Sequence, residues 1–170
     1  MNNKGKTIII ILITIIIGLL GYIMIDKLNL IDKNANSLIK AGYIKQEDGN
    51  YKAYINGSEE LEKDSEKLPY VLNYAIVKND YSEISFHSEW RVDNKETYIN
   101  RWYDYKYNSS SNIAKGDFTE IWKKGDFNIY HASYDFNNGN LICDAPQKEC
   151  NNYAQDLINL KERYYSLIKK

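Results

Sequence analysis

The amino-terminal region contains an uninterrupted apolar run that fits a lipid bilayer better than a protein core. Thr7–Ile25 reads TIIIILITIIIGLLGYIMI and carries no charged residue. A helix over residues 8–25 would be about 27 Å long, which is close to the hydrocarbon thickness of a membrane. A strand of this length would exceed those of ordinary sheets. We therefore expect a transmembrane helix over residues 7–25, with the lipid bilayer as its partner.

The run has the features of an uncleaved signal anchor. No small-x-small cleavage triplet follows Ile25, and no cysteine lies near the end of the run. Lysines flank the run on both sides, so the positive-inside rule does not decide the orientation. Two cysteines near the carboxyl end favour an extracytoplasmic domain. We expect residues 1–6 in the cytoplasm and the domain outside the cell membrane, with the reverse orientation as the alternative.

The composition limits the function classes that the rest of the chain fits. The 170 residues carry a formal net charge of −1, whereas a nucleic-acid-binding protein usually has a basic excess. Hydrophobic residues make up 44% of the chain and aromatic residues 14%, which is enough for a folded core. The abundance of Asn, Ile, Lys and Tyr is typical of proteins from AT-rich bacterial genomes. We expect one small bacterial domain that binds no nucleic acid.

Apolar periodicity predicts an α+β fold for the part that follows the anchor. A three-and-four spacing predicts a juxtamembrane helix over residues 26–47 that ends near Ala41-Gly42. From residue 48 to residue 170 we expect an extracytoplasmic domain. Short runs with a period of two, separated by turn residues, predict an antiparallel meander of about five or six strands. These runs are residues 51–55, 70–77, 81–92, 97–107, 117–122, 127–136 and, briefly, 141–143.

The chain closes with an amphipathic pattern that predicts a helix packed on the sheet. Its apolar stripe consists of Cys150, Tyr153, Ala154, Leu157, Leu160, Tyr164, Leu167 and Ile168. Asp144 with Gln147 could form an early cap. An early start would move the axis about 9 Å between Asp144 and Cys150, which strains a disulfide unless Cys143 folds back over the first turn. We therefore expect a regular helix only from near Cys150 to Ile168.

Cys143 and Cys150 are the only cysteines, and we expect them to form a structural disulfide. Two free thiols are the alternative that a cytosolic location would favour. The chain has no further cysteine for a zinc site and no C-x-x-C redox motif.

Two histidines offer a low-ranking metal site. His87 and Glu89 share one face of a predicted strand, and His131 and Asp135 share one face of another. If the two strands were neighbours, these four side chains could bind a metal ion. Ordinary polar alternation explains the same pattern, so we predict no metal and no cofactor.

One strand is unusually aromatic and is the candidate binding strip. Its aromatic residues are Tyr98, Trp102, Tyr103, Tyr105 and Tyr107. An exposed strip of this kind binds sugars, peptides or a partner surface. Burial of the strip under a helix is the competing interpretation.

No catalytic motif of the G-x-S-x-G, S-x-x-K or H-E-x-x-H type occurs. We expect a non-enzymatic, single-pass, membrane-anchored binding or accessory domain of the bacterial cell envelope, whose partner is another envelope protein or a cell-wall component. The alternative is a membrane-anchored metal-dependent hydrolase that uses His87, Glu89, His131 and Asp135.

The order of an apolar helix, an antiparallel sheet and a late cysteine pair is similar to that of pseudopilins. In that family a glycine precedes the apolar run and a glutamate follows five residues into it. Here Gly5 is followed by Lys6-Thr7-Ile8-Ile9-Ile10, without the glutamate. An immunity-type or pseudopilin-like envelope accessory protein is a minor alternative.

Overall fold

The sheet follows the order of the chain from one edge to the other. The computed structural model describes residues 3–63, 70–93, 98–123 and 126–168. Side chains of residues 3–12, 26, 29–32, 60, 63, 93, 98, 99, 122, 123 and 126 lie outside this description. The eight strands pair as β1-β2-β3-β4-β5-β6-β7-β8, with antiparallel neighbours throughout.

The α+β prediction with an antiparallel sheet and a covering helix is confirmed, but the strand count of five or six was wrong. The strands are β1 (Ile44–Lys45), β2 (Tyr51–Asn56), β3 (Tyr70–Val77), β4 (Glu83–Asp93), β5 (Tyr98–Asn108), β6 (Ile113–Lys123), β7 (Asp126–Asp135) and β8 (Asn140–Cys143). A short helix, α2 (Glu59–Lys63), connects β2 and β3. The two-residue strand β1 was not predicted, because so short a segment carries little periodicity, whereas β8 matches the brief predicted run of residues 141–143.

β6 begins at Ile113, four residues before the predicted start at residue 117, and it includes Gly116. A Cβ at Gly116 would lie 2.6 Å from the Phe118 ring and 2.8 Å from Tyr105 Cβ. Glycine is therefore required where two aromatic side chains cross the strand. In sequence the same glycine weakens the strand pattern.

One continuous helix, α1 (Asn3–Lys40), contains both the expected span and the expected juxtamembrane helix. It ends at the predicted place, where Gly42 has a φ of +85°. The Tyr43 amide donates to the Leu38 carbonyl over 3.0 Å, and the Gly42 amide donates to the Ile39 carbonyl over 3.0 Å, which forms a Schellman cap. Residues 44–45 then form β1, so the segment of residues 26–47 contains the end of α1 and the first strand.

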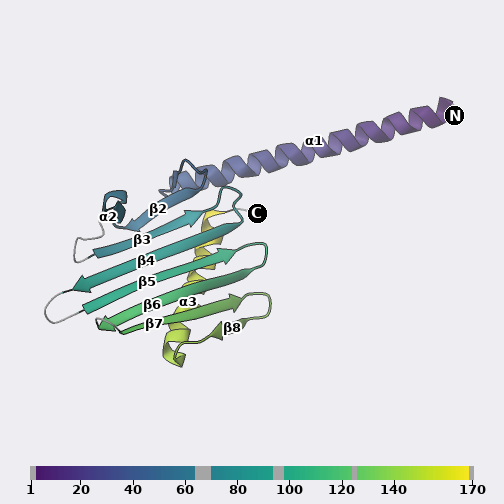
Figure 1. The fold of residues 1–170 in the computed structure, drawn as a ribbon. Helices are drawn as coiled ribbons and strands as arrows, with labels where there is room; N and C mark the ends of the chain where they lie inside the picture. Colours follow the sequence, from purple (N-terminus) through teal and green to yellow (C-terminus); the bar gives the residue numbers. More distant parts are fainter. Residues whose placement is uncertain (1–2, 64–69, 94–97, 124–125, 169–170) are drawn as a thin grey trace.

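Among the residues described, no helix combines the length and the apolar character needed to cross a membrane. The expected span over residues 7–25 lies within α1, and the side chains of residues 7–12 lie outside the described part. Only the carboxyl end of α1 packs on the domain, through buried Asn34 and Leu38. The rest of α1 projects away from the sheet (Figure 1).

Helix α3 (Gln147–Leu167) covers one face of the sheet (Figure 1). Its buried residues recur at helical spacing and are Cys150, Tyr153, Leu157, Leu160, Tyr164 and Leu167. They pack against the side chains of β3–β7 that alternate toward the helix, including Val77, Ile84, Tyr107, Ala114 and Phe118. The Tyr164 hydroxyl donates to the Tyr81 carbonyl over 2.7 Å and thereby ties α3 to the β3–β4 turn.

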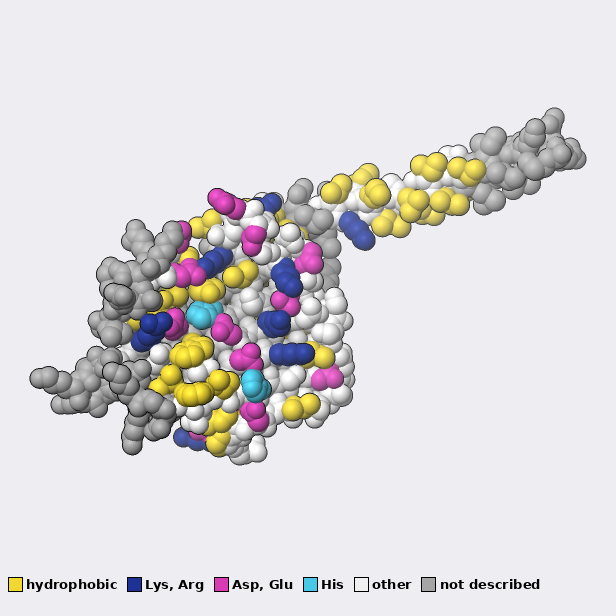
Figure 2. Space-filling model, viewed as in Figure 1, with side chains coloured by type: hydrophobic (Ala, Val, Ile, Leu, Met, Phe, Trp, Pro, Cys, Tyr) yellow, Lys and Arg dark blue, Asp and Glu magenta, His cyan; other side chains and the backbone are white. Residues whose placement is uncertain are grey.

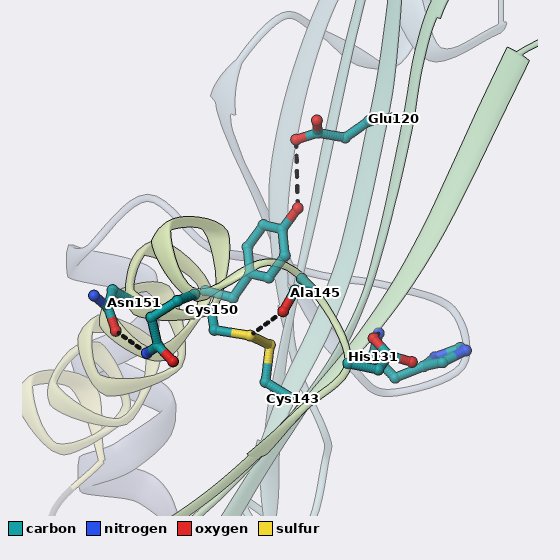
Figure 3. Close-up of a disulfide and its surroundings, with 9 residues drawn as sticks. Glu120, His131, Cys143, Ala145, Cys150 and Asn151 are labelled. Carbon is teal, nitrogen blue, oxygen red and sulfur yellow. Dashed lines mark hydrogen bonds between the residues drawn. A yellow bond between two sulfur atoms is a disulfide. The ribbon is translucent and has the colours of Figure 1, made fainter.

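The predicted disulfide joins the start of α3 to β8, as Figure 3 shows. Cys143 and Cys150 have a Cα–Cα distance of 5.9 Å. The predicted late start of the helix was wrong, because α3 begins at Gln147 after Pro146. Residues 144–146 are not helical and fold back. Of the segment between the two cysteines, only residues 147–149, in the first turn of α3, are helical. An early helix start is therefore compatible with the bridge.

Candidate functional site

The face of the sheet opposite α3 is the candidate binding surface, and we call it the open face. Figure 2 shows it from the side on which no helix covers β4–β7. Because side chains alternate along strands, β4 places His87 on this face, β5 Asp104, β6 Asp117 and β7 His131. Cross-strand pairing joins these four residues into one line across the sheet.

This line, the charged row, consists of His87, Asp104, Asp117 and His131. His87 Nδ1 donates to Asp104 Oδ1 over 2.6 Å, and His131 Nδ1 donates to Asp117 Oδ1 over 2.7 Å. Figure 2 shows both histidines with acidic side chains between them. The row therefore consists of two histidine–aspartate pairs placed with their carboxylates adjacent.

The hydrogen bonds to the aspartates determine the protonation of the histidines. The hydrogen bond to Asp104 raises the pKa of His87 above its usual value, although burial acts in the opposite direction. The hydrogen bond to Asp117 likewise raises the pKa of His131. The protonated form of each imidazole is favoured beside its carboxylate.

A second row runs beside the first and carries two lysines. Lys106 on β5 pairs directly with Lys115 on β6, just as Asp104 pairs with Asp117. Like charges directly opposite one another destabilise a sheet, although each lysine lies diagonal to an aspartate. A shallow hollow of about 350 Å³ lies over this part of the face. Its lining includes Tyr74, Ile76, Ser85, His87, Asp104, Lys106, Lys115 and Asp117.

Ring stacking, a cation–π contact and an ion pair extend the charged row toward α2. The Tyr74 ring stacks on His87 with a centroid distance of 4.8 Å. Lys52 lies 4.0 Å from the centroid of the Tyr74 ring and donates to Glu62 over 2.6 and 2.8 Å. Burial raises the pKa of Glu62, but hydrogen bonds from Lys52 and Tyr54 outweigh it, so the pKa is lowered.

Apolar side chains occupy the other side of the charged row. We call Trp102, Ile121, Phe127 and Ile129 the apolar patch. Pairing places Trp102, Thr119 and Ile129 in line on β5, β6 and β7. Phe127 is 64% exposed and Ile129 is 49% exposed. The open face thus combines apolar groups with charges of both signs.

The predicted aromatic strip is divided between the two faces. Tyr103, Tyr105 and Tyr107 point toward α3, and Tyr107 is completely buried. Trp102 lies on the open face, and the side chain of Tyr98 lies outside the described part of the chain. Tyr107 lies in the core and Tyr103 and Tyr105 pack against it, so among the described side chains of the strip only Trp102 contributes to the candidate surface.

Tyr103 leads to a second hollow, between α3 and the sheet. The hydroxyls of Tyr103 and Tyr153 both donate to Glu120 Oε1, the latter over 3.4 Å. Burial raises the pKa of both tyrosines and of the nearby Asp156. The tyrosines remain protonated and keep Glu120 within the helix–sheet contact, which is a structural role.

The residues of the alternative metal site do not converge. His87 and His131 lie on β4 and β7 with two strands between them, which separates the strands by about 14 Å. Glu89 accepts a hydrogen bond from Arg91 over 2.6 Å, and Asp135 binds the β7–β8 turn at Asn137. In the described part of the chain, no three His, Cys, Asp or Glu side chains form a metal-binding cluster.

Both histidines stood out in the sequence, but the aspartates that bind them did not. The missing signal was the pairing register, since Asp104 and Asp117 lie in other strands.

No known protein family, curated protein or solved structure matches this chain. The interpretation of the site therefore depends on its own geometry.

Proposed function

We propose that this chain is a single-pass, membrane-anchored binding protein of the bacterial cell envelope, and that its open face binds a polypeptide partner without catalysis. The observation that carries the proposal is the uncovered sheet face, where charged and apolar groups lie in ordered rows. The anchor, the orientation and the partner class are supported by different features.

The exposed apolar side chains of α1 support the membrane anchor. Large apolar residues from Ile13 to Ile25 are 50–72% exposed on the projecting part of the helix (Figure 2). Such a surface is unfavourable in water and favourable in lipid. The uncharged run Thr7–Ile25 supplies the sequence for insertion.

The disulfide supports an extracytoplasmic domain. Disulfides persist in oxidising compartments and are rare in the bacterial cytosol. With Cys143 bound to Cys150, we place the domain outside the membrane and residues 1–6 in the cytoplasm.

The composition of the open face favours a polypeptide partner. The charged row and the lysine pair contribute both signs of charge, so the face has no cationic excess for a polyanionic wall polymer. Exposed aromatic side chains beside a polar rim are typical of protein interfaces, and charged groups there meet opposite charges on the partner. The cross-strand pairs Asp104–Asp117 and Lys106–Lys115 place like charges together at a cost to the isolated sheet. Complementary charges on a partner would offset that cost.

The absence of catalysis is part of the same proposal. Each histidine is held by an aspartate, yet neither has a serine or cysteine at hydrogen-bond distance among the described residues. A hydrolase would need such a nucleophile or a metal ion near the base.

Photo-crosslinking from the two faces tests the proposed binding surface. A photoreactive residue replaces Ser85 on the open face, and a matched variant carries it in place of Gln155, which is exposed on α3. Both full-length proteins are expressed in bacterial membranes. We expect one discrete protein adduct from position 85 and none from position 155. Equal adducts from both positions, or none from position 85, would contradict the proposal.

A further inference from the structure

The first half of β7 is an open edge of the sheet. β8 pairs only with Ala132–Asp135, although β7 begins at Asp126. Residues 127–130 therefore have β6 on one side and no strand on the other within the described structure. Edge strands of this kind offer unpaired backbone groups to another strand.

The backbone groups that point outward are identified by His131. Its amide donates to Asp144 Oδ1 over 2.6 Å, and its carbonyl accepts from the Asp144 amide over 3.2 Å, both on the side away from β6. Outward and inward groups alternate along an antiparallel strand. Ile129 and Phe127 therefore present their N–H and C=O groups at the edge, while Asn128 and Tyr130 bind β6.

The strand keeps this alternation up to Phe127. The irregularity between β6 and β7 lies between Glu120 and Lys123, where β6 contains the extra residue. β7 itself continues without an insertion. The outward groups of Phe127 and Ile129 have no hydrogen-bond partner among the described residues.

The side chains at this edge are apolar and exposed. Phe127 and Ile129 belong to the apolar patch and are 64% and 49% exposed. Natural edge strands are usually protected by a charge, a proline or a covering segment. Asp144 provides such cover only at His131, where it also leaves an exposed carboxylate beside the edge.

We propose that this edge of β7 binds an extended peptide of another protein, which adds to the sheet as a further strand. Two residues of the peptide, spaced by one, would pair with Ile129 and Phe127 and place apolar side chains beside theirs. If the peptide runs antiparallel to β7, the peptide residue two positions before the one opposite Ile129 would lie beside Asp144. A lysine or arginine at this position fits the carboxylate. This mode supplies backbone hydrogen bonds for affinity and side-chain contacts for specificity.

A second copy of this chain is the other occupant with the right backbone geometry. Two identical edge strands pair antiparallel about an axis perpendicular to the sheet. Such an axis would point the two α1 helices in opposite directions, because α1 extends roughly along the plane of the sheet from its far edge (Figure 1). Two anchors in one membrane exclude that arrangement, so the choice of a foreign peptide rests on the proposed anchoring of α1.

Hydrogen exchange with a synthetic peptide tests the inference. The probe is acetyl-Lys-Thr-Val-Thr-Val-Thr-amide, added to the full-length protein in detergent micelles. We expect slower exchange of the Phe127 and Ile129 amides on peptide addition and no change at Leu141 on the outer side of β8. Unchanged exchange at Phe127 and Ile129 at saturating peptide overturns the proposal.

Variants of the edge test whether the peptide binds at β7 through its backbone. Ile129→Pro removes an outward N–H without removing a bond to β6, and we expect at least about tenfold weaker peptide binding. The matched change Leu141→Pro on β8 should leave affinity unchanged. Should Ile129→Pro not fold, Ile129→Lys keeps the backbone donor and places a charge in the apolar contact, again with weaker binding expected. Wild-type affinity in the folded edge variants overturns the proposal.

Sedimentation of the same samples distinguishes the second copy. A dimer that Ile129→Pro dissociates would identify another copy as the occupant and overturn the foreign-peptide assignment. Membrane extraction is measured separately, so failure of the edge proposal and failure of the anchor give different results.

Discussion

At the scale of residues, two histidines depend on aspartates from neighbouring strands. His87 also faces Glu89, whose Oε2 lies 3.9 Å from Nε2, and stacks on Tyr74. Burial alone would lower the pKa of His87, whereas the Asp104 hydrogen bond raises it. The carboxylate therefore decides the sign of the shift.

Substitution of Asp104 should reverse that shift. In the wild type we expect NMR titration of His87 above the reference value of about 6.5, and in Asp104→Asn a pKa at or below it. Since the folded pKa is raised, the interaction stabilises the fold fully below the unfolded pKa. That stability is lost as the pH rises through the folded pKa. Equal titration of His87 in both proteins would show that Asp104 is not the cause.

Gly116 gives a second prediction at this scale. Gly116→Ala forces the Phe118 ring or Tyr105 to move, and we expect a loss of about 1–3 kcal/mol in the free energy of unfolding. Urea unfolding measures it. Phe118→Leu, which removes part of the obstructing ring, should cost less in the Gly116→Ala background than in the wild type. Simple additivity of the two changes would contradict the packing account.

At the scale of elements, the disulfide and α3 act as one unit. Cys143 and Cys150 connect β8 to the first turn of α3, and Tyr153 in the next turn stacks on Phe118 with a centroid distance of 3.8 Å. The bridge therefore positions the end of the helix that enters the core. This coupling makes residues 144–149, which include the first turn of α3, part of the helix–sheet contact.

Removal of the bridge should weaken the domain without abolishing its fold. For Cys143→Ser/Cys150→Ser we expect the free energy of unfolding to fall by about 2–3 kcal/mol, from the closure entropy of a short loop. Chemical unfolding of the oxidised wild type and the variant gives the difference. The reduced wild type is the control and should match the variant, so a stable reduced protein would contradict this role.

Sequence periodicity predicted the elements better than their partners. The apolar stripe of α3 and the alternation in β4 are local patterns, and both are visible in the chain. The pairing of His87 with Asp104 depends on the register between β4 and β5. A shift of one residue in that register would move Asp104 to the opposite face of the sheet. The early β6 start was hidden because Gly116 has a packing role that only the fold defines. The candidate site was therefore predictable as residue types on strands, but not as a row.

At the scale of the whole molecule, α1 and the open face lie on different parts of one chain. α1 attaches beside β1 and β2, and Arg163 of α3 donates to the Tyr43 hydroxyl over 3.1 Å at its base. The open face extends from this base to the β7 edge. In the proposed arrangement α1 holds the domain at the membrane while the face remains accessible.

Alkaline extraction of bacterial membranes tests the anchor. We expect the full-length protein to remain with the membrane after carbonate washing, because its apolar helix is held by lipid. The control Ile16→Lys/Leu20→Lys places two charges in the run and should be released, since each charge opposes insertion by about 2.5–3.5 kcal/mol. Release of the wild-type protein would contradict the anchor.

In the proposed function, the ordered charges of the open face bind a partner. Asp104→Lys/Lys106→Asp exchanges two neighbouring charges on β5, keeps the composition and places opposite charges across from Asp117 and Lys115. The exchange removes the His87–Asp104 hydrogen bond, but it replaces two like cross-strand pairs by two unlike pairs, which are favourable, so we expect the variant to fold. Urea unfolding verifies that the variant is folded.

The most direct test is the yield of the protein adduct formed from the photoreactive residue at position 85, compared between the wild-type background and this charge exchange. We predict a loss of at least about tenfold in the exchanged variant, because reversed charges repel a partner that fits the native pattern. An unchanged yield from a folded variant would show that the rows of charge do not bind the partner.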